Sequence, residues 1–170
     1  MRMMIVSCPG GGHKTLTARG REQALDLAER MPLDEGDVIV AGPFPGMLQM
    51  AGLWAGEGGA SRFIHPLAET RAHPFRLNRS AKSQGLPVEP TELVRRFPEW
   101  LPANGLPEHL WLQGVHALPP LLFGQHAGRF AVWCRTLGKS RIAVVTDEGM
   151  RMALLEALTE EEDFKNCLFL

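Results

Sequence analysis

The chain has 170 residues, the length of one ordinary domain, and its 45% hydrophobic and 22% charged residues exclude a disordered protein. Its 18 basic and 19 acidic side chains give a formal net charge of -1, which argues against a broadly basic nucleic-acid-binding protein. No apolar run reaches the roughly 18 residues of a membrane span, and the apolar N-terminus is too short for a signal peptide. We therefore expect a cytoplasmic protein that binds neither membrane nor nucleic acid.

The first half of the sequence alternates short apolar runs with segments of helical periodicity. Residues 3–7 (MMIVS), 37–41 (DVIVA) and 63–67 are typical of buried strands. A helix is predicted from an N-cap at Thr17 to Met31, where Pro32 ends it. A second helix is predicted over 47–54, stopping near Gly56.

The second half contains more loop residues. Residues 70–90 and 98–107 are predicted loops, on either side of a short helix over 91–97 capped by Thr91. A long helix is predicted over 115–137, with two prolines in its first turn and Gly138 after its end. Residues 141–146 (RIAVVT) form the clearest strand, followed by a helix that begins at Gly149 or its neighbour and runs through Leu158, and by an edge strand over 164–170.

This alternation predicts an α/β protein: a three-layer α/β/α sandwich with a mostly parallel central sheet. No linker divides the chain, so we expect a single domain over 1–170, with an insertion or lid at about 70–112. Ligand sites of such sheets lie at the carboxyl ends of the strands. The residues to examine therefore follow the predicted strands, at 7–12, 42–46, 65–71 and 146–149.

Five segments in chain order resemble the histidine phosphatase superfamily, which has the phosphoglycerate mutase-like fold. They are LTARGREQA at 16–24, DVIVAGPF at 37–44 with QMA at 49–51, LAE at 67–69, the stretch from Ser83 through Glu92-Leu93 to Phe97-Pro98, and IAVVTDEG at 142–149. The resemblance implies that fold, with a nucleophilic histidine after the first strand. It also implies two arginines and a second histidine that hold the phosphate, and an acidic proton donor.

The chain departs from this pattern at four of the implied catalytic positions. Ser7 stands in place of the first arginine, Cys8 in place of the nucleophilic histidine, and Gly46 in place of the second arginine. Asp147 stands in place of the second histidine, and only Glu69, the implied proton donor, is retained.

The lost cationic groups and the added carboxylate should weaken phosphate binding. Each lost charge-assisted hydrogen bond is worth roughly 1.5–3 kcal/mol. A carboxylate at ~4 Å from a phosphate adds repulsion on the order of 4 kcal/mol at an effective dielectric constant of 20. We therefore predict a degenerate member that does not hydrolyse phosphate esters through phosphohistidine, and that instead binds a small molecule or a protein partner or has a regulatory role.

The alternative is a diverged hydrolase or phosphatase-like enzyme. In it, Cys8 would act as nucleophile with a lowered pKa, or Asp147 and Glu69 would act as acid and base. Ser7, His13, Lys14, Gly46, Arg71 and Glu148 are the candidate binding residues around these three.

Two other motifs are weak evidence for a phosphate-binding loop. GGGHKT at 10–15 lacks the glycine that a nucleotide P-loop has before its lysine. The spacing from Cys8 to Lys14 resembles the loop of cysteine phosphatases, but a lysine cannot replace the bidentate arginine of that loop.

A metal site and a cofactor are not predicted. Cys8, Glu69 and Asp147 with His13, His65 or His73 are the residue types that bind a divalent metal or a cationic ligand. Pairing of the carboxylates with Arg71 or Lys14, or their solvation, accounts for them more simply.

Overall fold

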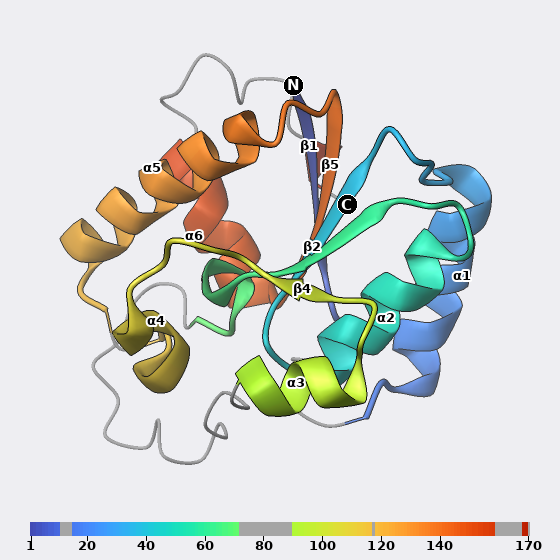
Figure 1. Cartoon of the computed structure of the whole chain (residues 1–170), viewed down its shortest axis with the longest axis horizontal. Helices are drawn as coiled ribbons and strands as arrows, with labels where there is room; N and C mark the ends of the chain where they lie inside the picture. The colour runs from blue at the N-terminus through green and yellow to red at the C-terminus, as the bar shows by residue number, and fades with distance from the viewer. Residues whose placement is uncertain (11–14, 72–89, 117, 159–167, 170) are drawn as a thin grey trace.

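The computed structural model describes residues 1–10, 15–71, 90–116, 118–158 and 168–169 (Figure 1). Its strands are β1 (Arg2–Ser7), β2 (Val38–Ala41), β3 (Ser61–Ile64), β4 (Leu101–Pro102), β5 (Arg141–Thr146) and β6 (Leu168–Phe169). They form one sheet in the order β4-β3-β2-β5-β1-β6, and every neighbouring pair is parallel. The predicted α/β class with a parallel sheet is confirmed.

The helices lie on both faces of this sheet (Figure 1). They are α1 (Ala18–Arg30), α2 (Pro45–Ala55), α3 (Pro90–Arg96), α4 (Glu108–Gln113), α5 (Pro120–Thr136) and α6 (Glu148–Leu158), with a 3-10 turn, η1, at Pro66–Ala68. Strand alternation explains the two layers: in β1, Met4 and Val6 pack toward α1 and α2, while Met3 and Ile5 pack toward α5 and α6. The arrangement is consistent with the predicted three-layer sandwich.

Several predicted boundaries differ from the observed ones. The long helix expected from 115 begins only at Pro120, the short strand β4 lies in the predicted loop 98–107, and α4 lies in a segment for which no element was predicted. The third strand ends at Ile64 rather than at 67, because Pro66 opens η1. Thr91 lies inside α3 instead of capping it. The start of α6 at Glu148, next to Gly149, agrees with the prediction.

The predicted insertion or lid at about 70–112 is described only in part. Residues 72–89 lie outside the described residues, as does most of the edge strand predicted over 164–170. Within this region, β4 pairs with β3, and Leu93, Trp100 and Trp111 are buried in the same core as α1 and α2. None of the described helices is long and apolar enough to cross a membrane.

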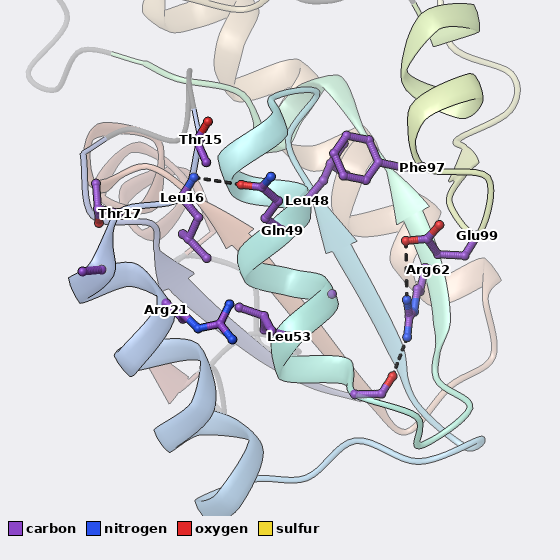
Figure 2. Close-up of a pocket in the computed structure, with 13 residues that line it drawn as sticks. Thr15, Leu16, Thr17, Arg21, Leu48, Gln49, Leu53, Arg62, Phe97 and Glu99 are labelled. Atoms are coloured by element: carbon purple, nitrogen blue, oxygen red, sulfur yellow. Dashed lines mark hydrogen bonds and ion pairs between the residues drawn. The ribbon is translucent and has the colours of Figure 1, made fainter.

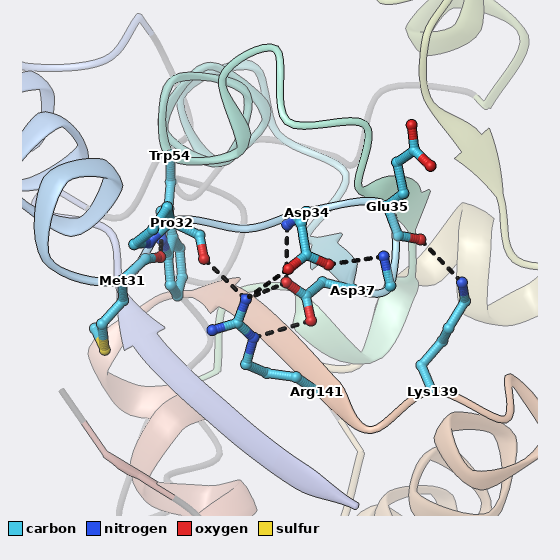
Figure 3. A network of polar contacts seen from close by, with 9 residues as sticks. Met31, Pro32, Asp34, Glu35, Asp37, Trp54, Lys139 and Arg141 are labelled. Carbon is cyan, nitrogen blue, oxygen red and sulfur yellow. Dashed lines mark hydrogen bonds and ion pairs between the residues drawn. The ribbon is translucent and has the colours of Figure 1, made fainter.

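A partly buried ion pair lies at the amino-terminal edge of the sheet, opposite the candidate site (Figure 3). Asp37, just before β2, accepts hydrogen bonds from the guanidinium of Arg141, the first residue of β5. Arg141 also donates to the carbonyl of Pro32 at 2.8 Å, and Asp37 accepts the Asp34 N–H at 2.9 Å. The pair thus fixes the loop before β2 against β5, at a distance from the carboxyl ends of the strands.

Candidate functional site

The central strands bring the predicted site residues to one edge of the sheet. Ser7 pairs with Thr146 in the parallel register, so the segments that follow β1 and β5 leave the sheet side by side. The Cys8 N–H donates to the carbonyl of Thr146 at 2.6 Å, and the hydroxyl of Thr146 donates to the carbonyl of Glu69 at 3.3 Å. Cys8, Glu69 and Asp147 therefore meet, as the sequence predicts.

Five residues make up what we call the strand-end cluster: Cys8, Glu69, Arg71, His116 and Asp147. Electrostatic interaction links Asp147 to both Cys8 and Glu69. His116 lies against Glu69, with Nδ1 3.4 Å from Oε1. Arg71 contributes its backbone N–H, 3.4 Å from Oδ1 of Asp147.

Asp147 is also the N-cap of α6. Its Oδ1 accepts the N–H of Met150 at 2.7 Å, and its carbonyl accepts the N–H of Arg151 at 2.9 Å. Burial, with smaller contributions from the charges of Glu69 and Glu148, raises the pKa of its carboxyl from 3.8 to about 6. The Asp147 carboxyl therefore titrates near pH 6, well above the pH at which an ordinary aspartate does.

Glu69 is almost completely buried, with 1% of its surface exposed. Its Oε2 accepts the N–H of Val115 at 3.0 Å, and burial raises its pKa against the opposing effect of His116. Gly114 has a positive φ of 70°, and a Cβ at this position would lie 2.3 Å from Oε1 of Glu69. A glycine is thus required for the loop to close over the carboxylate.

His116 is the functional candidate that sequence analysis missed. It lies in the loop between α4 and α5, and its hydrogen bond to Glu69 raises its pKa. A histidine fixed by a carboxylate through Nδ1 presents Nε2 in a defined orientation, which is the usual arrangement of a general base. Its partner is 47 residues earlier in the chain, so no local spacing marks it.

Arg71 does not supply a phosphate-binding guanidinium here. Nη1 donates to the carbonyl of Val115 at 2.8 Å and Nη2 to that of Leu118 at 2.9 Å, while the guanidinium carbon lies 4.0 Å from the centre of the Phe123 ring. The side chain is buried and directed to the loop between α4 and α5, and burial lowers its pKa to about 10. Its charge is used to hold that loop.

Cys8 has the opposite electrostatic character from the one a nucleophile requires. Burial, and secondarily the charge of Asp147, raise the pKa of its thiol to about 11. Only 3% of its surface is exposed. A lowered pKa, on which the cysteine-nucleophile alternative depends, is therefore not observed.

The other predicted binding residues divide into three groups. The Glu148 carboxylate accepts hydrogen bonds from the guanidinium of Arg151, at 2.6 and 2.8 Å, and from the hydroxyl of Ser7. These contacts lower its pKa. Gly46 lies buried in the first turn of α2, at the same edge of the sheet. His13 and Lys14 lie outside the described residues.

His65, the second histidine considered at this edge, belongs to the core. Its Nδ1 accepts the N–H of Leu67 at 3.0 Å, and its ring packs against Phe130 and Trp133 with centroids 4.7 Å apart. Burial lowers its pKa to about 3, so it stays neutral at any physiological pH. His73 lies outside the described residues.

The cluster has no metal-binding arrangement in the described part of the chain, where no group of three or more suitable side chains converges.

Comparison of the sequence with protein-family models finds no match. Comparison with curated protein sequences likewise finds none.

Proposed function

We propose that this chain is a histidine phosphatase-like protein that has lost phosphoryl transfer and that binds a small molecule or a protein partner through its strand-end cluster. The supporting observation is the environment of Asp147. This carboxyl accepts backbone N–H groups and interacts with a second buried carboxyl, Glu69. A phosphate at this position would meet two acidic groups.

The cations near the cluster support the same proposal. Arg71 is directed away to two backbone carbonyls, and Arg151 is bound to Glu148. His116 is positively charged only below its pKa, and there it is paired with Glu69. Among the described residues, no guanidinium of the cluster is left to bind an oxyanion in the bidentate manner that phosphoryl transfer requires.

The test measures hydrolysis of a phosphate monoester such as p-nitrophenyl phosphate at pH 5 to 8, together with binding of orthovanadate. We expect no turnover above that of the Asp147→Asn and Glu69→Gln variants, and no vanadate binding at millimolar concentration. Turnover that either substitution abolishes, or a phosphorylated protein intermediate, would overturn the proposal. The triple variant Ser7→Arg, Cys8→His, Asp147→His is informative because it restores cationic groups: it should bind vanadate more tightly than the parent protein.

A second candidate function is acid–base catalysis, favoured by one raised pKa and one contact. Asp147 has a pKa of about 6, and Glu69 orients His116. Together they provide a proton donor and a proton acceptor at one edge of the sheet. In this alternative, Asp147→Asn and Glu69→Gln would abolish turnover of a bound compound while leaving its affinity within a few-fold, whereas a pure binding protein would show no turnover to lose.

A further inference from the structure

A groove separate from the strand-end cluster lies on the outer side of α1 and α2 (Figure 2). It has a volume of about 610 Å³, within the usual range of about 300–1,000 Å³ for sites that bind small organic molecules. No residue of the strand-end cluster lines it. Its described lining residues are Thr15, Leu16, Thr17, Ala18, Arg21, Leu48, Gln49, Gly52, Leu53, Gly56, Arg62, Phe97 and Glu99.

The groove has apolar walls. Leu16 lies before α1, Leu48 and Leu53 lie on α2, and Phe97 lies after α3 (Figure 2). Two glycines of α2 and its end, Gly52 and Gly56, also line it, and a Cβ at either one would meet no atom within 4 Å. Because a glycine inside a helix costs roughly 1 kcal/mol relative to alanine, Gly52 leaves space at a cost in helix stability that no close packing explains.

Two residues that line the groove carry hydrogen-bond donors, Gln49 on α2 and Arg21 on α1 (Figure 2). The Oε1 of Gln49 accepts the N–H of Leu16 at 2.8 Å, which assigns the amide orientation and leaves Nε2 as a donor. Arg21 extends from α1 toward Leu53 of α2 (Figure 2). Within the part of the chain that the structure describes, Arg21 makes no hydrogen bond and no ion pair.

The other charged side chains of the groove are already paired. Arg62 donates to the carbonyl of Gly56 at 2.6 Å and lies 3.7 Å from Glu99. The pair cancels in charge, so Arg21 leaves one positive charge in excess among the described lining residues. A complementary ligand has an apolar body and one anionic group.

We propose that this groove binds a small amphipathic monocarboxylate, with its carboxylate at Arg21 and its apolar body along Leu48, Gly52 and Leu53. A carboxylate accepts two parallel hydrogen bonds from a guanidinium, which matches the one unpaired charge. The apolar body covers Leu53, whose side chain is only partly buried, whereas Leu48, with 1% of its surface exposed, is already covered by the protein.

The first test uses octanoate as the probe, with acetate, octan-1-ol and octylammonium as comparison compounds, in titrations monitored by amide chemical shifts. We expect saturable binding of octanoate, with shifts confined to residues 15–21, 48–56, 62 and 97–99. Each comparison compound lacks the apolar body or the negative charge and should bind at least tenfold more weakly. Failure of octanoate to bind at 10 mM, or equal binding of octanol, would overturn the proposal.

Two matched pairs of variants locate the site. Arg21→Glu should weaken octanoate binding at least tenfold, while Arg19→Glu, the same charge change on the exposed side of the same helix, should leave it within twofold. Gly52→Leu fills the groove and should abolish binding. Gly124→Leu makes the same substitution in α5, where a Cβ also meets no atom within 4 Å, and should leave binding unchanged. Equal effects within either pair would contradict the assignment.

Discussion

Glu69 and Arg71 bind the two polar groups of the same residue. Glu69 accepts the N–H of Val115 at 3.0 Å, and Arg71 donates to the carbonyl of Val115 at 2.8 Å. A carboxylate and a guanidinium two residues apart thus fix a loop more than 40 residues further along the chain. This loop carries His116, so the geometry of the strand-end cluster depends on both contacts.

Loss of the Arg71 guanidinium should destabilise the fold. Arg71→Met leaves the carbonyls of Val115 and Leu118 without their charged donor, and each such hydrogen bond is worth about 1.5–3 kcal/mol. We expect a decrease of about 3 kcal/mol in the free energy of unfolding, measured by urea denaturation at pH 7. Arg19→Met, on an exposed side chain of α1, serves as the control and should change stability by less than about 0.5 kcal/mol. Equal stability of the two variants would show that the loop is held by other contacts.

Gly114 should be the least replaceable of the glycines with positive φ. Gly114→Ala introduces a Cβ that would lie 2.3 Å from the Glu69 carboxylate, in addition to the strain of a positive φ. Gly105→Ala is the matched control, because Gly105 has a φ of 75° and open space around it. We expect a cost of about 1 kcal/mol at Gly105 from the backbone alone, and on the order of 3 kcal/mol at Gly114.

A double-mutant cycle tests whether the additional cost of Gly114→Ala comes from the Glu69 carboxylate. If the clash with the carboxylate causes the additional cost, Glu69→Ala should remove most of it, so that Gly114→Ala becomes no more costly than Gly105→Ala in that background. Strict additivity of the two substitutions would instead assign the cost to the backbone.

The sequence is sufficient to predict the central strands β1, β2 and β5, but neither the short strand β4 nor the loop that completes the site. Short, continuous apolar runs such as MMIVS predict strands that are buried on both faces of a parallel sheet. The Thr17 side chain caps α1 as expected by accepting the Gly20 N–H at 3.1 Å. The apolar spacing after Val115 also fits a helix. Long-range contacts from Glu69 and Arg71 hold that segment as a loop instead, and no local pattern encodes them. Pro119 and Pro120, which cap and begin α5, were the available signal for the true boundary.

The parallel topology predicts that Cys8, Glu69 and Asp147 lie close together. It does not predict their raised pKa values. Sequence position places them after strands or after η1, and the carboxyl ends of parallel strands share one edge. The raised pKa values arise from burial, which depends on how completely the surrounding loops cover the site. Sequence alone gave no measure of that coverage.

Stability should decrease as the pH rises through the range in which Asp147 ionises. Its pKa is about 6 in the folded protein and 3.8 ordinarily, so the folded state binds more protons than the unfolded state between these values. The raised pKa values of Glu69 and His116 act in the same direction. Asp147→Asn keeps an N-cap oxygen and removes the charge, so it should be more stable than the parent above pH 6, by up to about 3 kcal/mol, and nearly equal at pH 4. Urea denaturation at pH 4 to 8 measures this; a constant difference between the two proteins would contradict the assignment.

The Cys8 thiol should be alkylated slowly, and the alkylation rate should not reach a plateau below pH 10. With a pKa of about 11 and 3% of its surface exposed, its thiolate fraction at neutral pH is very small. We expect the rate of iodoacetamide modification of the Cys8 peptide, followed by mass spectrometry, to rise about tenfold per pH unit from 7 to 10. Glutathione under the same conditions gives the profile of an ordinary thiol. A rate that levels off below pH 8 would instead support a nucleophilic Cys8.

The Asp37–Arg141 pair should dominate the acid sensitivity of the opposite edge of the sheet. The hydrogen bonds from Arg141 lower the pKa of Asp37 below 3.8, so the stability that the pair contributes is complete above that value and is lost as the pH falls through the lower, folded-state pKa. Asp37→Asn should cost about 2 kcal/mol at pH 7, because it removes the carboxylate that accepts hydrogen bonds from the guanidinium, which is itself 30% exposed to water. The difference from the parent should shrink as the pH is lowered from 5 to 2. Asp34→Asn is the control: its side chain is 76% exposed and 3.8 Å from Arg141, so it should cost less than about 1 kcal/mol. A difference for Asp37→Asn that stays constant down to pH 2 would show that the pair does not carry the acid response.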